Sequence, residues 1–289
     1  MHLGLTFYIV DVFAEEKYAG NQLAVVRGGA DLSDEALGKL ALEMNYSETS
    51  FVLSDEETDG GYDVRIFTPG QEVPFAGHPT LGTAYVIRHE ILGEPIEQVT
   101  LNLKAGRIPV TFGDVLWMRQ LPPTFGPTLD PAPTALALNI ASEDVDDRFP
   151  VQEVSTGIPA IIVPLRDLDA LGRCKVDWER YLEVAGPGKN LYVFCPGSHA
   201  AGPGNISARM FANDLGVPED PATGSAAGCL AGYLVEHHYL DTDSIDVRVE
   251  QGYEVNRPSL LYLQASREGD ATVVHVGGKV QMVATGELI

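Results

Sequence analysis

Cysteine is scarce in this sequence, and long apolar runs are missing. Only three of the 289 residues are cysteines, Cys174, Cys195 and Cys229. An odd number of distant thiols without a Cys-x-x-Cys pair argues against a disulfide framework and against a thiolate zinc site. Such cysteine usage fits a reducing compartment, so we expect a cytoplasmic protein. The longest apolar runs, such as 158–165, are far shorter than the roughly 20 residues of a membrane helix, so no membrane partner is expected.

Basic residues are also few. Lys and Arg number 19 against 41 Asp and Glu, which gives a formal net charge of −22. Such a surface repels the phosphates of nucleic acid, so nucleic acid is not an expected partner. The simplest interpretation of the acidity is solubility, and one local cationic site can still hold an anion. Residues 1–7 lack a basic flank, so we expect them to lead into a first strand rather than to form a signal peptide.

Apolar periodicity predicts alternating strands and helices in the first half of the chain. Strands are expected at 5–12, 23–26, 50–53, 62–67, 97–103, 107–112 and 115–120. Ser33 is a good N-cap, and apolar residues recur at helical spacing behind it, so 34–45 is predicted to be an amphipathic helix. A second, more apolar helix is expected over 80–90.

The Pro-rich stretch 121–133 is typical of a linker, and the order of elements begins again after it. Strands are expected at 160–163, 190–194 and 206–211, followed by an apolar helix over 224–238. We therefore expect an N-terminal half, residues 1–118, joined by a C-terminal strand near 279–289. Residues 119–278 would form the C-terminal half.

A short internal repeat supports two similar halves. The pattern Arg-apolar-Phe occurs at 65–67 and at 209–211, and Val-Pro follows at 73–74 and at 217–218. Both offsets are 144 (209 − 65 and 217 − 73), and each copy leads into a Gly- and Thr-rich turn before a helix of small residues. The repeat predicts two α/β halves related by a pseudo-twofold axis. The two turn–helix units would face each other across a cleft.

Two helix N-termini aimed into one cleft make a site for a negative charge. Each offers unpaired backbone N–H groups and the positive end of a helix dipole, which suits a carboxylate or a developing enolate. Gly77, Gly224 and Ser225 are small enough for a ligand to approach the backbone. The alternative is a pair of ordinary capped helices, with Thr80 and with Thr223 or Ser225 as caps. The paired occurrence of the motif favours the ligand site.

Three side chains are candidates for acid–base chemistry. Glu48 lies among uncharged neighbours where a helix meets a strand, so partial desolvation could raise its pKa toward the range of proton transfer. His78, at a helix start, could donate to a substrate oxygen or relay a proton. Asp220 precedes a proline in a tight turn, and it could pair with His78 across the cleft. The plain alternatives are an exposed glutamate, a structural histidine and a turn-forming aspartate.

Several segments resemble the PhzF-like family of phenazine biosynthesis, and together they span most of the chain. They are Gly-Asn-Gln-Leu-Ala-Val at 20–25, Ser-Glu-Thr-Ser-Phe-Val at 47–52, Arg-Ile-Phe-Thr-Pro at 65–69, Glu-Val at 72–73, Gly-His-Pro-Thr at 77–80 and Asp-Pro-Ala-Thr-Gly-Ser-Ala at 220–226. Each motif is weak alone, whereas their order and spacing are specific.

The resemblance implies an α/β (α+β) fold of the diaminopimelate-epimerase type. Two pseudo-symmetric halves each wrap a mainly antiparallel sheet around a central helix, with the active site between them. It also implies a homodimer, no cofactor and no metal, and a small carboxylate substrate. In the best understood member, a proton moves between ring carbons of a hydroxylated dihydroanthranilate. The implied catalytic residues are Glu48 as the proton shuttle, His78 and Asp220; the implied substrate-binding residues are Asn21, Gly77, Thr80, Gly224, Ser225 and Ala226.

One departure from the wider fold superfamily bears on the mechanism. Related epimerases and racemases use two cysteines, one at each helix start, but Ala76 stands before Gly77 and no cysteine occurs at 220–225. Cys229 is one helical turn past Ser225, so we expect it in the core. A proton shift by a single carboxylate is therefore preferred. An epimerase, racemase or hydrolase on the same scaffold stays open, as does a small-molecule-binding protein without catalysis.

Overall fold

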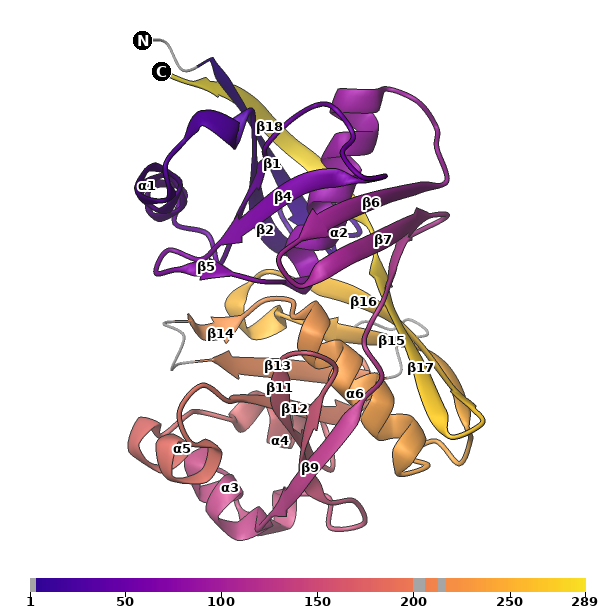
Figure 1. Ribbon diagram of the computed structural model, residues 1–289. Coiled ribbons are helices and arrows are strands. Elements are labelled where there is room, and N and C mark those ends of the chain that lie inside the picture. The colour runs from indigo at the N-terminus through magenta and orange to yellow at the C-terminus, as the bar shows by residue number, and fades with distance from the viewer. Residues whose placement is uncertain (1–3, 200–205, 213–216) are drawn as a thin grey trace. The chain divides into compact units, whose positions relative to one another are not determined.

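The computed structural model describes residues 4–199, 206–212 and 217–289 (Figure 1). Contacts between Cα atoms divide the chain into two compact units. The N-terminal unit comprises Met1–Arg119 and Gly277–Ile289, and the C-terminal unit comprises Gln120–Val276. Within the described residues, none of the helices combines the length and the apolar character of a membrane span.

The described residues of the N-terminal unit form two α-helices and nine strands. Its elements are β1 (Leu5–Val12), β2 (Asn21–Arg27), α1 (Asp34–Met44), β3 (Thr49–Val52), β4 (Tyr62–Phe67), β5 (Glu72–Val73), α2 (Gly77–Val86), β6 (Gln98–Leu103), β7 (Gly106–Phe112), β8 (Leu116–Arg119) and β18 (Val280–Leu288). A π-helical stretch, Ile87–Leu92, continues α2, and a short 3-10 turn covers Gly29–Asp31.

Outside 200–205 and 213–216, the C-terminal unit forms four α-helices. Its elements are β9 (Thr124–Leu129), α3 (Pro131–Ala137), β10 (Val151–Ser155), β11 (Pro159–Pro164), α4 (Leu168–Arg173), α5 (Trp178–Ala185), β12 (Asn190–Pro196), β13 (Ile206–Ala212), β14 (Val217–Asp220), α6 (Gly224–Glu236), β15 (Ser244–Gln251), β16 (Ser259–Glu268) and β17 (Ala271–Gly278), the last of which runs on into the N-terminal unit. Short 3-10 turns cover Ser142–Asp144 and Tyr253–Val255.

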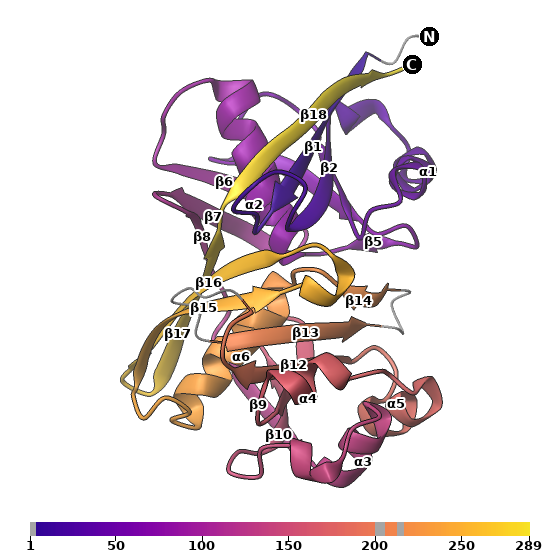
Figure 2. The same cartoon turned by 180° about the vertical axis from the view of Figure 1, so that it is seen from behind.

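In the N-terminal unit a mainly antiparallel sheet wraps around α2. Its parallel pairs are β2 with β3 and β4 with β6, and β18 returns antiparallel along β1, as both ribbon views show (Figure 2). α2 contacts β1, β2, β3, β6, β7, β8 and β18, and almost all of its residues are buried. A helix that is apolar all round is expected to lie in a core. The amphipathic α1 covers the opposite face through Leu37 and Ala41, which pack with Phe51 and Phe67.

The C-terminal unit repeats this plan. Its parallel pairs are β11 with β12 and β13 with β15, and the central helix α6 contacts β10, β11, β15 and β16. On the other face, Leu171 of α4 and Tyr181 of α5 join a core cluster with Leu191 and Phe211. The predicted fold class is confirmed, because each unit is a mainly antiparallel sheet around one buried helix.

The two copies of the Arg-apolar-Phe motif have the same local structure. Arg65 on β4 makes two hydrogen bonds to Glu72, at 2.9 and 2.7 Å, and Arg209 on β13 makes two to Glu219 at the same distances. Each guanidinium also lies over the phenylalanine two residues later, 5.0 and 4.8 Å from the ring centre. The predicted equivalence of the two Arg-apolar-Phe segments is thus confirmed.

The predicted equivalence of the two Val-Pro pairs is wrong. Ile66 pairs with Val73, whereas Met210 pairs with Asp220, so the strand register aligns Val73 with Asp220 rather than with Val217. The offset therefore changes from 144 on the strands to 147 at the helices, since α2 starts at Gly77 and α6 at Gly224 (224 − 77). The three extra residues of the second copy lie between Phe211 and Glu219 in the sequence, since seven residues separate this pair and four separate Phe67 from Glu72.

The prediction that the Pro-rich stretch 121–133 is a linker is wrong, because β9 and α3 form there. β9 pairs with β10, and the register shifts beside Gly126 and Pro127. The hydrogen-bond ladder therefore does not need the N–H that Pro127 lacks. α3 begins with Pro131 behind the N-cap Asp130, whose side chain accepts a hydrogen bond from Ala132 N. Proline is favoured in a first helical turn, where its missing N–H costs nothing.

Candidate active site

Glu48 lies at the entrance of a central strand of the N-terminal unit. α1 ends at Asn45, which takes a left-handed conformation with φ of 54°, and β3 begins just after Glu48. β3 is flanked by β2 and β4, with Thr49 opposite Ala24 on one side and Phe67 on the other. Because Phe51 faces the α1 core, alternation along the strand turns Glu48 toward α2.

The carboxyl group of Glu48 meets the imidazole of His78. Glu48 Oε2 lies 3.6 Å from His78 Nε2, and the two side chains are 19% and 5% exposed. His78 is the second residue of α2, and α2 packs on β1, β2 and β3. Two residues 30 positions apart (78 − 48) are therefore brought together by the packing of the central helix on its own sheet.

Burial keeps His78 neutral. Loss of solvation lowers the pKa of its imidazole from 6.5 to about 3, although a hydrogen bond with the backbone of Gln22 acts in the opposite direction. That hydrogen bond favours the protonated ring, so the Gln22 carbonyl is the acceptor. Because Nε2 faces Glu48, the ring donates to Gln22 through Nδ1, and the neutral tautomer carries its proton there.

His78 is expected not to titrate near neutral pH. A histidine with its ordinary pKa loses its proton near pH 6.5, whereas the carbon-13 shift of His78 Cε1 should stay that of a neutral ring from about pH 8 to about pH 4. The urea-unfolded protein supplies the reference curve. Since only the unfolded state binds the proton in this window, His78 should also make folding less favourable as the pH falls from 6.5 toward 3. A midpoint near pH 6.5 in the folded protein would contradict the buried, neutral assignment.

The first turn of α2 offers backbone N–H groups without a side-chain cap. Ala76 is the N-cap, and among the described residues no side chain caps this end. Helix geometry leaves the N–H groups of Gly77 and His78 without intrahelical acceptors, and Pro79 has no N–H. Thr80 is fully buried and its hydroxyl donates to Ala76 O at 2.8 Å, so the predicted alternative of Thr80 as a cap is wrong.

Asn21 begins β2 beside the same region. It is 2% exposed and pairs with Val12 of β1. Its neighbour Gln22 carries the backbone group that meets the His78 ring. The early Gly-Asn-Gln motif therefore lies next to the histidine of the Gly-His-Pro-Thr motif, which connects two of the segments that were singled out in the sequence.

The start of α6 carries the corresponding groups in the C-terminal unit. Thr223 is the N-cap by position, but its hydroxyl donates to Asp220 Oδ2 instead of capping the helix. No described side chain caps this end, so the N–H groups of Gly224, Ser225 and Ala226 have no intrahelical acceptor. Ser225 is half-buried, and its backbone carbonyl accepts from Thr156 Oγ1 at 3.4 Å. The predicted pairing of His78 with Asp220 joins residues of different units and stays a prediction.

Comparison with known proteins places the chain in a family. The family model described as phenazine biosynthesis-like protein, PhzC-PhzF, matches residues 10–286. The chain belongs to the PhzC-PhzF family. It is 34% identical over 288 residues to the trans-2,3-dihydro-3-hydroxyanthranilate isomerase of Pseudomonas aeruginosa, covering 97% of this chain and 98% of the relative.

Solved structures agree with the PhzF assignment. A PhzF-family phenazine biosynthesis protein from Bacillus anthracis superposes with a TM-score of 0.91 at 27% identity, covering 99% of each chain. A hydroxyproline epimerase from Agrobacterium vitis superposes with a TM-score of 0.60 at 12% identity, covering 100% of this chain and 94% of the epimerase. The second match shows that this chain shares its fold with that epimerase.

The cysteines of this PhzF-family chain are all free and buried. Cys229 Sγ lies 3.5 Å from Ile158 O and 3.7 Å from Thr156 Oγ1, and burial raises the pKa of its thiol to about 11. Burial also raises the pKa values of Cys174 and Cys195, each to about 12. The prediction that Cys229 packs in the core is confirmed. None of these thiols has the exposure or the low pKa of a reactive cysteine.

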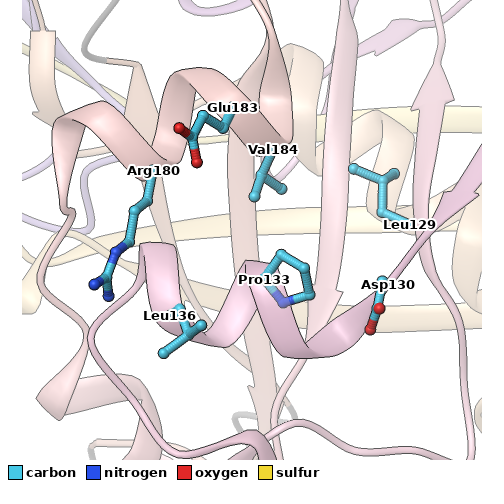
Figure 3. Close-up of a pocket in the computed structure, with 7 residues that line it drawn as sticks. All are labelled: Leu129, Asp130, Pro133, Leu136, Arg180, Glu183 and Val184. Atoms are coloured by element: carbon cyan, nitrogen blue, oxygen red, sulfur yellow. The ribbon is translucent and has the colours of Figure 1, made fainter.

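A hollow on the C-terminal unit lies away from the predicted residues. It has a volume of about 360 Å³ between α3 and α5 and is lined by Leu129, Asp130, Pro133, Leu136, Arg180, Glu183 and Val184 (Figure 3). No motif residue of the PhzF family lines it. The catalytic candidates therefore draw no support from this hollow.

Sequence reasoning missed two residues that touch the candidate groups, Gln22 and Gln251, and one that supports them, Tyr192. Gln22 was quoted only as part of a motif, although its backbone binds the His78 ring. Tyr192 and Gln251, which are hydrogen-bonded to each other at 3.0 Å, were not identified. They are 59 residues apart, and neither belongs to a local motif, so only the strand pairing brings them to the 220–223 turn.

Proposed function

We propose that this PhzF-like isomerase moves a proton between two carbons of a small unsaturated or ring-bearing carboxylate, and that Glu48 carries the proton. The observation that supports this most is the contact of the Glu48 carboxyl with a buried, neutral His78, 3.6 Å apart. A proton shift by general acid–base catalysis needs a group that can both accept and release a proton during one turnover, and a carboxyl group can do both.

The neutral ring of His78 suits both halves of such a turnover. A histidine cation beside Glu48 would hold the carboxylate in its ionised form by charge attraction. His78 instead presents the lone pair of Nε2, since its proton lies on Nδ1 toward Gln22. This lone pair can accept a hydrogen bond from the carboxyl group after Glu48 has taken the substrate proton. The acid form of Glu48 is then held in place until it releases the proton to the second carbon.

The helix starts are proposed to bind the negative charge of the substrate. When a proton leaves carbon, charge develops on the remaining anion and spreads into its conjugated system. The N–H groups of Gly77 and His78 on α2, and of Gly224, Ser225 and Ala226 on α6, are fixed donors that stabilise such charge without reorganisation. Asp220 and Ser225 are proposed to hold polar groups of the same substrate molecule.

The named relative supports the proposed substrate class. Trans-2,3-dihydro-3-hydroxyanthranilate is the compound for which the Pseudomonas aeruginosa relative is named, and it is a ring-bearing carboxylate. We propose a substrate of this class for the present chain. A shift of a proton between carbons involves no net redox change, so the proposal invokes no cofactor. The homodimer implied by the resemblance stays a prediction.

The proposal is tested by incubating the full chain with trans-2,3-dihydro-3-hydroxyanthranilate and following the ring protons by NMR. Loss of the substrate signals at a rate proportional to enzyme concentration, with a product of unchanged mass, is the expected result. The same preparation with the substitution Glu48→Gln is the control for a contaminating activity. If the ring signals stay unchanged and no proton of the compound exchanges with deuterated water, a binding protein replaces the isomerase.

A further inference from the structure

A buried amide lies under the turn that precedes α6. Gln251, the last residue of β15, is 1% exposed. Its Nε2 donates to Asp220 O at 2.7 Å and to Thr223 Oγ1 at 3.2 Å, and its Oε1 accepts from Thr223 N at 3.3 Å and from Tyr192 OH at 3.0 Å. Both donor hydrogens and both lone pairs of the amide are therefore used.

The direction of these hydrogen bonds leads to the carboxylate of Asp220. Burial raises the pKa of Tyr192, so its hydroxyl keeps its proton and donates it to Gln251 Oε1. The amide must then turn its NH₂ group toward Asp220 O and Thr223 Oγ1. Since Thr223 Oγ1 accepts from Gln251, its own proton goes to Asp220 Oδ2. One chain of donors thus runs from Tyr192 to the Asp220 side chain.

The backbone next to Gln251 packs against the same turn. Gly252 has φ of 81°, and a Cβ atom there would lie 2.5 Å from Pro221 O and 2.3 Å from Arg257 O. No side chain fits at that distance, so the turn sits directly on the main chain after β15. Its position is set by backbone contact and by the Gln251 amide together.

The fold itself does not require this polar group. In the N-terminal unit Asp63 pairs with Asn102, and at the equivalent place in the C-terminal unit Ser207 pairs with Glu250. The next residues along the strands, Leu103 and Gln251, therefore occupy the same register position. Val73 is equivalent to Asp220 by strand register, and Ala76 to Thr223 as the N-cap. The same strand–turn–helix unit therefore forms with apolar residues at all three positions.

We propose that Gln251, held by Tyr192, is a positioning residue that fixes the Asp220 carboxylate and the first turn of α6 for the isomerisation. The inference rests on the proposed function, which gives Asp220 and Ser225 their roles. Gln251 acts through Thr223 and Asp220 rather than on the substrate. Buried polar networks of this kind hold one arrangement when every member is satisfied.

The central test is Gln251→Leu, which installs the residue that the N-terminal unit has at this position. With trans-2,3-dihydro-3-hydroxyanthranilate as the probe, kcat should fall by about 10- to 100-fold while KM changes by less than about 3-fold. Thr223→Val should lower kcat similarly, and Thr223→Ser, which keeps the hydroxyl, should restore it. Gln152→Leu is the matched control, since its amide bonds Gly126 O and His237 without touching the site.

A double-mutant cycle separates positioning from general destabilisation. On an Asp220→Asn background, Gln251→Leu should add less than about 3-fold to the loss in kcat, because both changes disturb the same carboxylate. Full additivity, or a Gln251→Leu enzyme with wild-type kcat, overturns the proposal. Crystals of Gln251→Leu provide a readout without turnover, and an unmoved Asp220–Thr223 turn also overturns it. If the wild-type chain leaves the probe unchanged, the proposed function is contradicted. The crystal structure of Gln251→Leu then still tests whether Gln251 positions the Asp220–Thr223 turn.

Discussion

Glu48→Gln is expected to lower kcat by about 10³-fold, with the fold and the affinity for a substrate-like carboxylate nearly unchanged. The amide has the shape of the carboxyl group but cannot take a proton from carbon at neutral pH. Glu48 is 19% exposed just before the start of β3, so the substitution leaves no large cavity and no buried charge. Steady-state kinetics, with the thermal midpoint and the binding of anthranilate measured on the same preparation, check this result.

The matched control is Glu43→Gln on the exposed side of α1. It makes the same chemical change five residues earlier (48 − 43) and should leave kcat within about 2-fold. Glu48→Asp keeps a carboxyl group but shortens its reach, so its kcat should lie between the two. If Glu48→Gln retains a tenth of the wild-type kcat, another group moves the proton.

The second large effect is expected from Arg209→Met, which should lower the free energy of unfolding by about 3–5 kcal/mol. Arg209 and Glu219 have side chains only 8% and 12% exposed. The guanidinium also donates to Leu171 O at 2.9 Å and to Cys174 O at 3.0 Å. Its loss leaves a buried carboxylate and two carbonyls without their donor. Urea unfolding and amide exchange along β13 measure the change.

Arg65→Met, the same substitution in the first repeat, is the control for Arg209→Met. Arg65 is 21% exposed, and Asp34, one of its carboxylate partners, is 84% exposed, so water can replace much of what is lost. We expect about 1 kcal/mol for this variant. Arg209→Met combined with Glu219→Leu should recover part of the lost stability, because it removes the stranded charge. Equal losses for the two arginines would contradict the buried-network explanation.

The sequence predicted correctly those helices and strands whose signals lie in neighbouring residues. Ser33 accepts a hydrogen bond from Ala36 N at 3.3 Å, as expected of an N-cap, and α1 spans Asp34–Met44 within the predicted 34–45. β1 runs over the predicted 5–12. In both cases residues adjacent in sequence carry the whole signal, through a cap and an apolar stripe or through alternation.

Tertiary context decided the segments that the prediction missed. No strand was predicted over 244–276, although Ile245, Val247 and Val249 alternate inward along β15. The proline content of 121–133 suggested a linker, but pairing with β10 makes Thr124–Leu129 a strand, and α3 begins at Pro131. The shared Val-Pro pair suggested that Val217 is equivalent to Val73, but strand pairing makes Asp220 equivalent to Val73. Strand register depends on the number of residues between the paired positions and not on local similarity.

The candidate residues of the N-terminal unit were identifiable from motifs, but their geometry was not. Strand register shows that Asn190 stands where the first repeat has Glu48, since Thr49 pairs with Phe67 and Leu191 with Phe211. Ser225 stands where the first repeat has His78, at the second position of each central helix. The contact of Glu48 with His78 therefore has no counterpart in the second repeat, and the polar support of Asp220 has none in the first.

The most direct measurement follows a deuterium label placed on the substrate carbon that loses its proton. With trans-2,3-dihydro-3-hydroxyanthranilate labelled at that carbon, single turnovers in ordinary water are analysed by NMR and mass spectrometry. If the carboxyl group of Glu48 both removes and returns the proton, part of the label appears on the second carbon of the product. Product that never carries the label, at any enzyme concentration, would contradict the transfer by one carboxyl group.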